Sequence, residues 1–274
     1  MAEKLPASYD GRRRPSTTWS KEDNLGIVLF SLEVLLREAK RFPFSGRCLS
    51  LGRQDVDLTA EQILLAADYM AASVTPPDEI GYSAKQHNRA QGFVSDDYLF
   101  ACLGIEHHDV LDVSDYEQSN LVFDLNRDDL PGEWVGQYDL IVDSGTLEHV
   151  FHLPNALNNL HRLLKVGGRI IHIVPSSNHI DHGFYMFSPT LFLDFYETNR
   201  FEINLIQVLK YDSNHMAGSY AFFDYTAGCL DGYRAGGLDA AMYGVVCVVT
   251  KTSESTGDRV PQQGVWARTY WRNA

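Results

Sequence analysis

A strand–helix–strand pattern between residues 138 and 175 limits the fold of this 274-residue chain more than any other feature. The run YDLIVDS (138–144) is short and apolar, as expected of a buried strand, and RIIHIVP (169–175) has the same character. Between them, LPNALNNLHRLLKVGG (153–168) has leucines at helical spacing, which predicts a helix that is stopped by its two terminal glycines. Two strands joined by a helix form a parallel pair.

The same alternation extends along most of the chain. Further strands are expected at 47–52, 108–114, 120–126, 201–211 and 241–251. Further helices are expected at 22–42, 57–72, 95–105 and 188–199. Thr59 with Gln62 forms a capping box, and Ser188 before Pro189 marks another helix start. The pattern predicts an α/β fold: a doubly wound, mostly parallel seven-stranded sheet with helices on both faces.

The domain organisation follows from the segments outside this alternation. Residues 1–20 are polar and contain two prolines, which predicts a flexible leader. Residues 21–251 form the expected domain, with an N-terminal helix and a Pro- and Gly-containing loop or lid-like insertion at 73–94. The tail, 252–274, is polar and then aromatic, and is expected either to pack on the domain or to be disordered.

Charge and cysteine content exclude several classes of protein. The formal net charge of −13 argues against nucleic acid as a partner, because phosphate binding needs a basic face. No apolar run reaches the roughly 18–20 residues of a membrane span, so no membrane partner is expected. The four cysteines contain no CxxC pair, which argues against a structural zinc site or a disulfide framework and favours a cytoplasmic location. The oligomeric state stays open.

Polar residues gather where the expected strands end, and parallel sheets bind ligands at those ends. Asp112 ends one strand and suits two ribose hydroxyls, whereas Asp124 suits an exocyclic amine with Leu125 packed on an adenine ring. Asp143 and the small residues Ser144 and Gly145 end another strand. Any one of these acids is explained by a turn or a helix cap, but their order along one alternating pattern favours a nucleoside-binding site.

With this order of strand-end residues, the segment 138–175 resembles the fourth strand, helix and fifth strand of the class I S-adenosylmethionine-dependent methyltransferases. The resemblance extends over roughly residues 45–250, and it implies a Rossmann-like methyltransferase fold with a reversed C-terminal hairpin. It implies S-adenosylmethionine as cofactor and S-adenosylhomocysteine as product. It implies cofactor-binding residues at the strand ends and in the loop after the first strand. These are Gly52, Arg53, Gln54, Asp112, Val113, Asp124, Leu125, Asp143, Ser144 and Gly145.

The loop after the first strand departs from the family. The segment LGRQDVD (51–57) keeps only Gly52 of the usual glycine-rich motif, and Arg53 and Gln54 stand where small residues are common. Three outcomes are open. We favour a variant loop in which Arg53 or Gln54 binds the cofactor carboxylate by its side chain; the others are weak cofactor binding and a non-catalytic relative.

The acceptor side is expected in the segment SSNHIDHGFYMFSP (176–189). His179, His182 and Tyr185 are the candidate substrate-binding residues, and His149, His182 and His179 are the candidate catalytic bases, since histidine titrates near neutral pH. A packing role is the plainer explanation for His149. His179 and His182, with Asp181 or His149, are of residue types that ligate metal ions. A loop whose polar side chains bond to its own backbone is the simpler explanation, so no metal is predicted.

The sequence therefore predicts methyl transfer to an oxygen or nitrogen atom of a small-molecule substrate. Two alternatives stay open. One is a catalytically inactive, methyltransferase-like binding or assembly protein. The other is a nicotinamide-dependent oxidoreductase, which is disfavoured because the glycine fingerprint that it requires is missing after the first strand.

Overall fold

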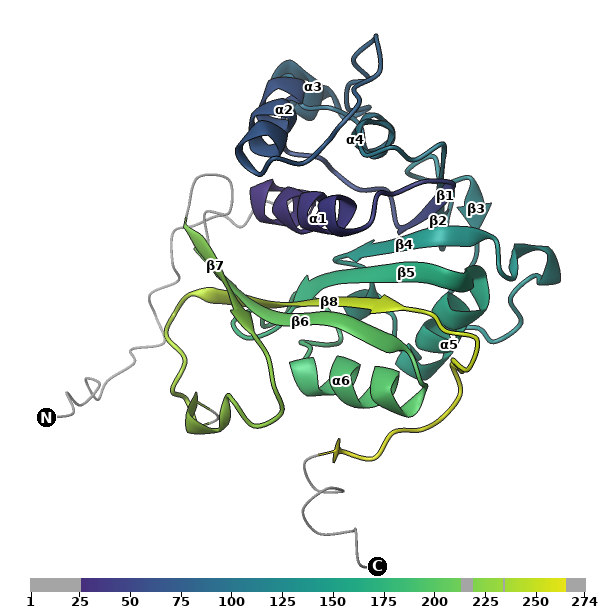
Figure 1. Cartoon of the computed structure of the whole chain (residues 1–274), viewed down its shortest axis with the longest axis vertical. Coiled ribbons are helices and arrows are strands. Elements are labelled where there is room, and N and C mark those ends of the chain that lie inside the picture. The colour runs from purple at the N-terminus through teal and green to yellow at the C-terminus, as the bar shows by residue number, and fades with distance from the viewer. Residues whose placement is uncertain (1–25, 213–218, 234, 265–274) are drawn as a thin grey trace, which may run out of the picture.

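The computed structural model describes residues 26–212, 219–233 and 235–264, and Figure 1 shows one mixed sheet with helices on both sides. The strands are ordered β3-β2-β1-β4-β5-β8-β6-β7. Their bounds are β1 Arg47–Leu51, β2 His107–Asp112, β3 Leu121–Val122, β4 Tyr138–Ser144, β5 Leu164–Pro175, β6 Glu202–Tyr211, β7 Tyr220–Asp224 and β8 Met242–Thr250. Strands β1 to β5 pair in parallel, and β8 pairs antiparallel with both β5 and β6. The mostly parallel sheet and its reversed C-terminal strand pair are thereby confirmed.

The helices form two layers because alternate strand residues face opposite sides of the sheet. The bounds are α1 Leu29–Arg41, α2 Ala60–Tyr69, α3 Gln86–Ala90, α4 Asp96–Cys102, α5 Leu153–Leu163 and α6 Pro189–Thr198. In β4, Leu140 and Val142 face the core under α1 and α4, whereas Ile141 faces the core under α5 and α6. Figure 1 shows α1 on one side of the sheet and α5 and α6 on the other.

In the described residues the sheet has eight strands, one more than the seven predicted. The additional strand, β7, lies between the strands expected at 201–211 and 241–251, and it pairs antiparallel with β6 from Gln207↔Asp224 to Tyr211↔Tyr220. It is an edge strand with exposed residues on it, such as Phe223, so its sequence shows neither a continuous buried run nor a strict alternation.

The helix expected at 153–168 ends earlier than its leucine pattern predicts. Helix α5 stops at Leu163, and Leu164 already pairs with Tyr138 as the first residue of β5. The Nζ of Lys251 donates to the carbonyls of His161 and Leu164, at 2.7 Å each, and so satisfies carbonyls at the end of the helix. The two glycines lie within β5, where Gly167 has a φ of 84°.

Other boundaries also differ. Helix α1 begins at Leu29, because Ile27 forms a parallel bridge with Val56 before the helix, and residues 22–25 of the expected helix lie outside the described residues. Strand β3 contains only Leu121 and Val122 of the expected 120–126. The 73–94 insertion contains the short helix α3 and two isolated bridges. The capping box of Thr59 and the cap of Ser188 are confirmed.

The ends of the chain lie partly outside the described residues, which include neither the expected leader, 1–20, nor the aromatic end of the tail. The described part of the tail packs along α6, where the main-chain N–H of Arg259 donates to Asn199 and that of Gly264 to Asp194. Within the described part of the chain, no helix has the length and apolar character needed to cross a membrane.

Candidate active site

A cavity of about 370 Å³ lies at the carboxyl ends of β1, β2 and β4. The chain reverses its strand order between β1 and β4, and ligands of doubly wound sheets bind at such a switch point. The volume is in the range of small-molecule sites, roughly 300–1,000 Å³. The lining residues are Gly26, Gly52, Arg53, Gln54, Asp55, Leu111, Asp112, Val113, Glu117, Phe123, Asp124, Leu125, Asn126, Ser144, Gly145, Thr146, His149 and Val150.

Gly52 begins the loop that follows β1 and holds it in a left-handed turn. Its φ is 69°, and its N–H donates to the carbonyl of Leu111 over 2.8 Å, which ties the loop to β2. A Cβ at this position would lie 3.4 Å from Thr146 Oγ1 and 3.7 Å from Asp112 Oδ2. Because Gly52 has no side chain, the space in the cavity between the ends of β2 and β4 stays unfilled.

Arg53 and Gln54 line the cavity but already have partners within the protein. The Arg53 guanidinium donates to Asp96 and Asp97 at 2.9 and 3.2 Å, and to the carbonyl of Gln118 at 3.0 Å. Burial alone would lower the pKa of Arg53, but the two carboxylates outweigh it and raise that pKa. The Gln54 amide donates back to the carbonyl of Leu51 at 2.8 Å. These bonds stabilise the variant loop, and contact with the cofactor carboxylate stays a prediction.

The expected nucleoside-binding residues line one wall together. Asp112 ends β2, and its Oδ1 accepts the N–H of Ser114 at 3.3 Å. Asp124 follows β3, and its Oδ1 accepts both the main-chain N–H and the side-chain amide of Asn126, at 2.9 and 2.7 Å. Leu125 is buried beside it. A carboxylate held in this way is oriented before a ligand arrives, which lowers the entropic cost of binding.

Asp143 is not among the lining residues of the cavity. Its side chain is fully buried, and its Oδ1 accepts the N–H groups of Thr146 and Leu147, both at 3.2 Å. Its Oδ2 contacts His172 Nδ1 at 2.7 Å, and His172 Nε2 contacts the Tyr196 hydroxyl at 2.6 Å. Asp143 therefore stabilises the turn after β4 from within the core, and the cavity is lined instead by residues that follow it, beginning with Ser144, Gly145 and Thr146.

The turn after β4 carries small residues on the cavity wall and then Glu148 and His149. Gly145 has a φ of 88°, and the Thr146 hydroxyl donates to the carbonyl of Leu51 at 2.6 Å, which joins the β1 and β4 ends. Glu148 and His149 lie in a 3₁₀ turn, Leu147–His149, which precedes the start of α5 at Leu153.

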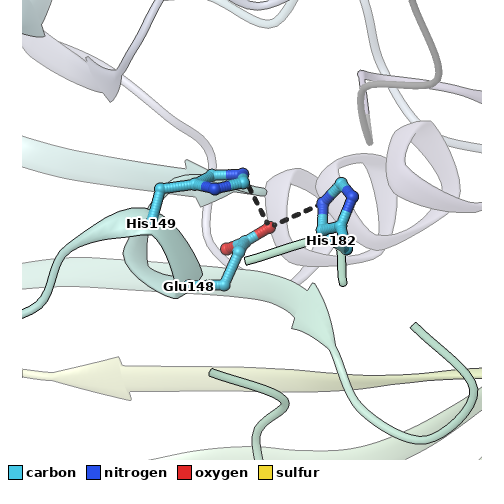
Figure 2. Close-up of side chains that lie close together, drawn as sticks. All are labelled: Glu148, His149 and His182. Carbon is cyan, nitrogen blue, oxygen red and sulfur yellow. Dashed lines mark ion pairs between the residues drawn. The ribbon is translucent and has the colours of Figure 1, made fainter. Parts of the chain in front are cut away.

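Glu148, His149 and His182 meet beside the cavity (Figure 2). Glu148 Oε1 lies 3.4 Å from His182 Nε2 and 3.9 Å from His149 Nε2, so the two imidazole rings approach the same carboxylate oxygen. Glu148 is 0% exposed, and burial raises the pKa of its carboxyl group. Burial also lowers the pKa of His149, with His182 as a further cause.

The segment that contains the acceptor-side candidates folds over Glu148. The N–H groups of Phe184 and Tyr185 donate to the carbonyl of Glu148, at 2.8 and 3.2 Å. A Cβ at Gly183 would lie 2.8 Å from that carbonyl oxygen, so a glycine is needed for this approach. This fold of the loop brings His182 to the same carboxylate oxygen that His149 approaches.

The side chains of His179 and Tyr185 bond to other protein groups and do not line the cavity. His179 Nε2 lies 2.8 Å from the Tyr211 hydroxyl, and burial, with His182, lowers the pKa of His179 to about 4. The Tyr185 hydroxyl donates to the carbonyl of Phe151 at 2.7 Å. Neither residue lines the cavity, and their roles in binding substrate stay predictions.

Sequence reasoning missed several residues at this site. Phe123, Asn126 and Thr146 each adjoin a predicted strand-end residue, so a wider window around each strand end would have included them. Gly26 and Glu117 come from segments without a strand-end signal. Glu148 stands out in the sequence beside His149, but no sequence signal connects its side chain with His182.

Comparisons with known proteins agree with this architecture. A family model described as a methyltransferase domain matches residues 33–239. A search of curated protein sequences finds no match to this chain.

Solved structures that resemble the chain include three methyltransferases. One is an S-adenosylmethionine-dependent methyltransferase from Thermotoga maritima, with 15% identity, a TM-score of 0.38, and coverage of 81% of this chain and 90% of the other. A second, from Archaeoglobus fulgidus, has 12% identity, a TM-score of 0.41, and coverage of 81% and 95%. The third is 1,6-didemethyltoxoflavin-N1-methyltransferase from Burkholderia thailandensis, with 13% identity, a TM-score of 0.31, and coverage of 81% and 80%.

The family model carries the assignment, because it spans most of the chain and includes β1 to β7. The sheet order, with its reversed strand β8 between β5 and β6, agrees with it. The cofactor of this family is S-adenosylmethionine. The chain belongs to the class I S-adenosylmethionine-dependent methyltransferases.

Proposed function

We propose that this methyltransferase acts on an oxygen or nitrogen atom of a small molecule, and that S-adenosylmethionine binds in the cavity at the ends of β1, β2 and β4. The observation that carries the proposal is the joint presence of Asp112, Asp124 and the small residues Ser144 and Gly145 on the walls of one cavity. Such a cavity offers carboxylate acceptors for hydroxyl and amine groups and leaves space for a ligand chain.

The cofactor's placement follows from the donor and acceptor groups on each wall. Asp112 accepts the ribose hydroxyls, and Asp124 lies by the adenine amine. Val113 and Leu125 would offer apolar contact to the ring, and Gly52 and Gly145 would leave space for the methionine part. With this orientation, the sulfonium methyl would be held near the turn that carries His149.

The reaction is an in-line displacement. A lone pair on the acceptor atom forms a bond to the methyl carbon, the carbon–sulfur bond breaks with its electron pair on sulfur, and S-adenosylhomocysteine leaves. The acceptor gives up its proton to a base or to water. Most of the acceleration then comes from positioning. His149 is the candidate base for that proton, because it lies on the cavity wall and its side chain is half-exposed.

The acceptor side favours a small molecule over a nucleic acid. The protein has 36 acidic and 23 basic residues, and a strand of phosphates would be repelled by this excess. A cytoplasmic location is part of the proposal, and the four cysteines, which are free and of which three are buried, support it.

Isothermal titration of the protein with S-adenosylmethionine and, separately, S-adenosylhomocysteine tests this function. We expect micromolar binding at about one site per chain. An absence of binding at millimolar concentrations of both ligands would contradict the cofactor site. Binding followed by transfer of a labelled methyl group to members of a small-molecule library, but not to nucleic acid, would support the acceptor class.

A further inference from the structure

We propose that Glu148, His149 and His182 form a binding site for a divalent transition-metal ion beside the cofactor cavity. The three side chains offer one carboxylate oxygen and two imidazole nitrogens, and these ligand atoms all lie within 4.8 Å of one another. Two histidines and one carboxylate are a ligand set that suits Zn²⁺, Fe²⁺ and neighbouring first-row ions. Mg²⁺ and Ca²⁺ prefer oxygen ligands and fit the set poorly.

The burial of Glu148 is the first observation that points to a cation. Its carboxylate is fully buried, and neither oxygen has a hydrogen-bond partner in the described part of the chain. A buried carboxylate without such partners is costly, because it has lost its hydration, and within the described residues only the two longer contacts to His182 and His149 offset that loss. The Nε2 atom of His182 is also buried and without a hydrogen bond there. Glu148 Oε1 and His182 Nε2 lie 3.4 Å apart, and an ion bound to both would supply the missing bonds.

The distances agree with ligands around a shared ion. With metal–ligand bonds of 2.0–2.1 Å, two ligand atoms of a tetrahedral site lie about 3.4 Å apart. The separation of Glu148 Oε1 and His182 Nε2 is 3.4 Å, which is long for a hydrogen bond. His149 Nε2 lies 3.9 Å from the same oxygen (Figure 2), and its side chain is 46% exposed.

The main chain holds this arrangement. The carbonyl of Glu148 accepts two N–H groups from the segment that follows His182, and Gly183 allows the segment to approach. His179, the other nearby histidine, is outside the ligand set, because its Nε2 contacts the Tyr211 hydroxyl. Glu148 and His149 come from the turn after β4, and His182 from the loop after β5. The site is thus built by two strand ends.

The metal site also limits the class of acceptor substrate, an inference that rests on the proposed methyl transfer. Three protein ligands leave a position open, as in catalytic metal sites. His149 lies on the cavity wall, so that position is near the methyl group. With the ion bound, His149 would be a ligand and not a base, so an acceptor hydroxyl on the ion would lose its proton to water. Its oxygen would then form the bond to the methyl carbon as the carbon–sulfur bond breaks. The acceptor class is therefore a molecule with a metal-binding oxygen.

Titration with Co²⁺ tests the metal site without requiring methyl transfer. The full chain is purified without a polyhistidine tag and dialysed against a chelator, and Co²⁺ is then added while its visible absorption is recorded. We expect about one equivalent to bind with micromolar affinity, and Zn²⁺ to displace it. Glu148→Gln and His182→Asn should each weaken Co²⁺ binding at least tenfold. His107→Asn, on the exposed start of β2, is the matched control and should leave it unchanged.

Binding of S-adenosylhomocysteine to the same samples separates the two proposals. Glu148→Gln should retain this binding, which shows that the variant is folded. Failure of the wild-type chain to bind millimolar Co²⁺ while it binds S-adenosylhomocysteine would overturn the metal site alone. Co²⁺ affinity that is unchanged in both Glu148→Gln and His182→Asn would also overturn it. Co²⁺ binding that these variants lose, in a chain that binds no S-adenosylhomocysteine, would support the metal site and contradict the cofactor site.

Discussion

Asp112 offers a carboxylate on the cavity wall, at the end of the second strand. A charged acceptor that bonds two ribose hydroxyls contributes more than a neutral one. We expect Asp112→Ala to weaken the binding of S-adenosylhomocysteine at least tenfold, as measured by calorimetry. Asp78→Ala, on an exposed loop residue away from the cavity, is the control. An unchanged affinity in folded Asp112→Ala would remove this residue from the ribose site.

Gly52 and Gly136 provide a second test at this scale, because both have a positive φ, 69° and 63°. A side chain in this conformation costs roughly 1–2 kcal/mol, so Gly52→Ala and Gly136→Ala should each lower the free energy of unfolding by about that amount. Only Gly52 lies on the cavity, so only Gly52→Ala should also weaken cofactor binding. Urea unfolding and calorimetry measure the two effects. Equal affinities in both variants would mean that the loop after β1 does not contact the cofactor.

Strand-end residues were predictable from the sequence because each follows a clear apolar run. The positions of Asp112 and Asp124 at strand ends therefore follow from the sequence alone. Asp143 shows the limit: its place at a strand end was predicted, but its carboxylate turns into the core toward His172. Side-chain direction depends on packing partners that are distant in sequence, and a local pattern does not contain them. The pairing of Glu148 with His182, 34 residues apart in the sequence, was missed for the same reason.

At the scale of elements, the end of α5 holds a histidine that should make stability depend on pH. Burial, with the positive charge of Lys251, lowers the pKa of His161 to about 4, whereas an unfolded histidine titrates near 6.5. Between these two values the unfolded chain binds a proton that the folded chain does not. The stability contributed by neutral His161 is therefore complete above pH 6.5 and is lost as the pH falls toward 4.

We expect His161→Gln to reduce this loss. The difference in the free energy of unfolding between pH 7.5 and pH 5 should shrink by about 1 kcal/mol relative to the wild type, after allowance for solvent screening of a partly exposed ring. His107→Gln, on an exposed residue, should leave the difference as it is. Chemical denaturation at the two pH values measures it. If the His161→Gln difference equals that of the wild type, His161 does not titrate between those values.

Element types were predictable where the hydrophobic period is long, and boundaries were not. Helix α5 shows this, since its leucine spacing continues through Leu164, yet pairing with Tyr138 draws Leu164 into β5. Strand β7 was missed because its five residues are partly buried or exposed at the edge of the sheet, so they form no buried apolar run. In both places, contacts with a distant strand decide the backbone, and a local window does not include that strand.

At the scale of the whole molecule, ligand binding should raise the thermal stability of the domain. The cavity joins the ends of three strands, so a ligand that binds there should bind the folded chain and not the unfolded one. At a concentration 100 times its Kd, S-adenosylhomocysteine would add about 2.7 kcal/mol, which corresponds to a rise in Tm of roughly 5–10 °C. Differential scanning calorimetry measures this rise. A Tm that stays constant despite calorimetric binding would mean that the ligand also binds unfolded protein or binds elsewhere.

The close approach of Gly183 to the carbonyl of Glu148 has a consequence for how this sequence can vary. A substitution at position 183 would push the loop after β5 away from the turn after β4, whatever the chemistry of the new side chain. In a library that samples all amino acids at every position, and that is selected for a folded chain, other residues should survive at 183. In a library selected for turnover, glycine alone should be recovered there.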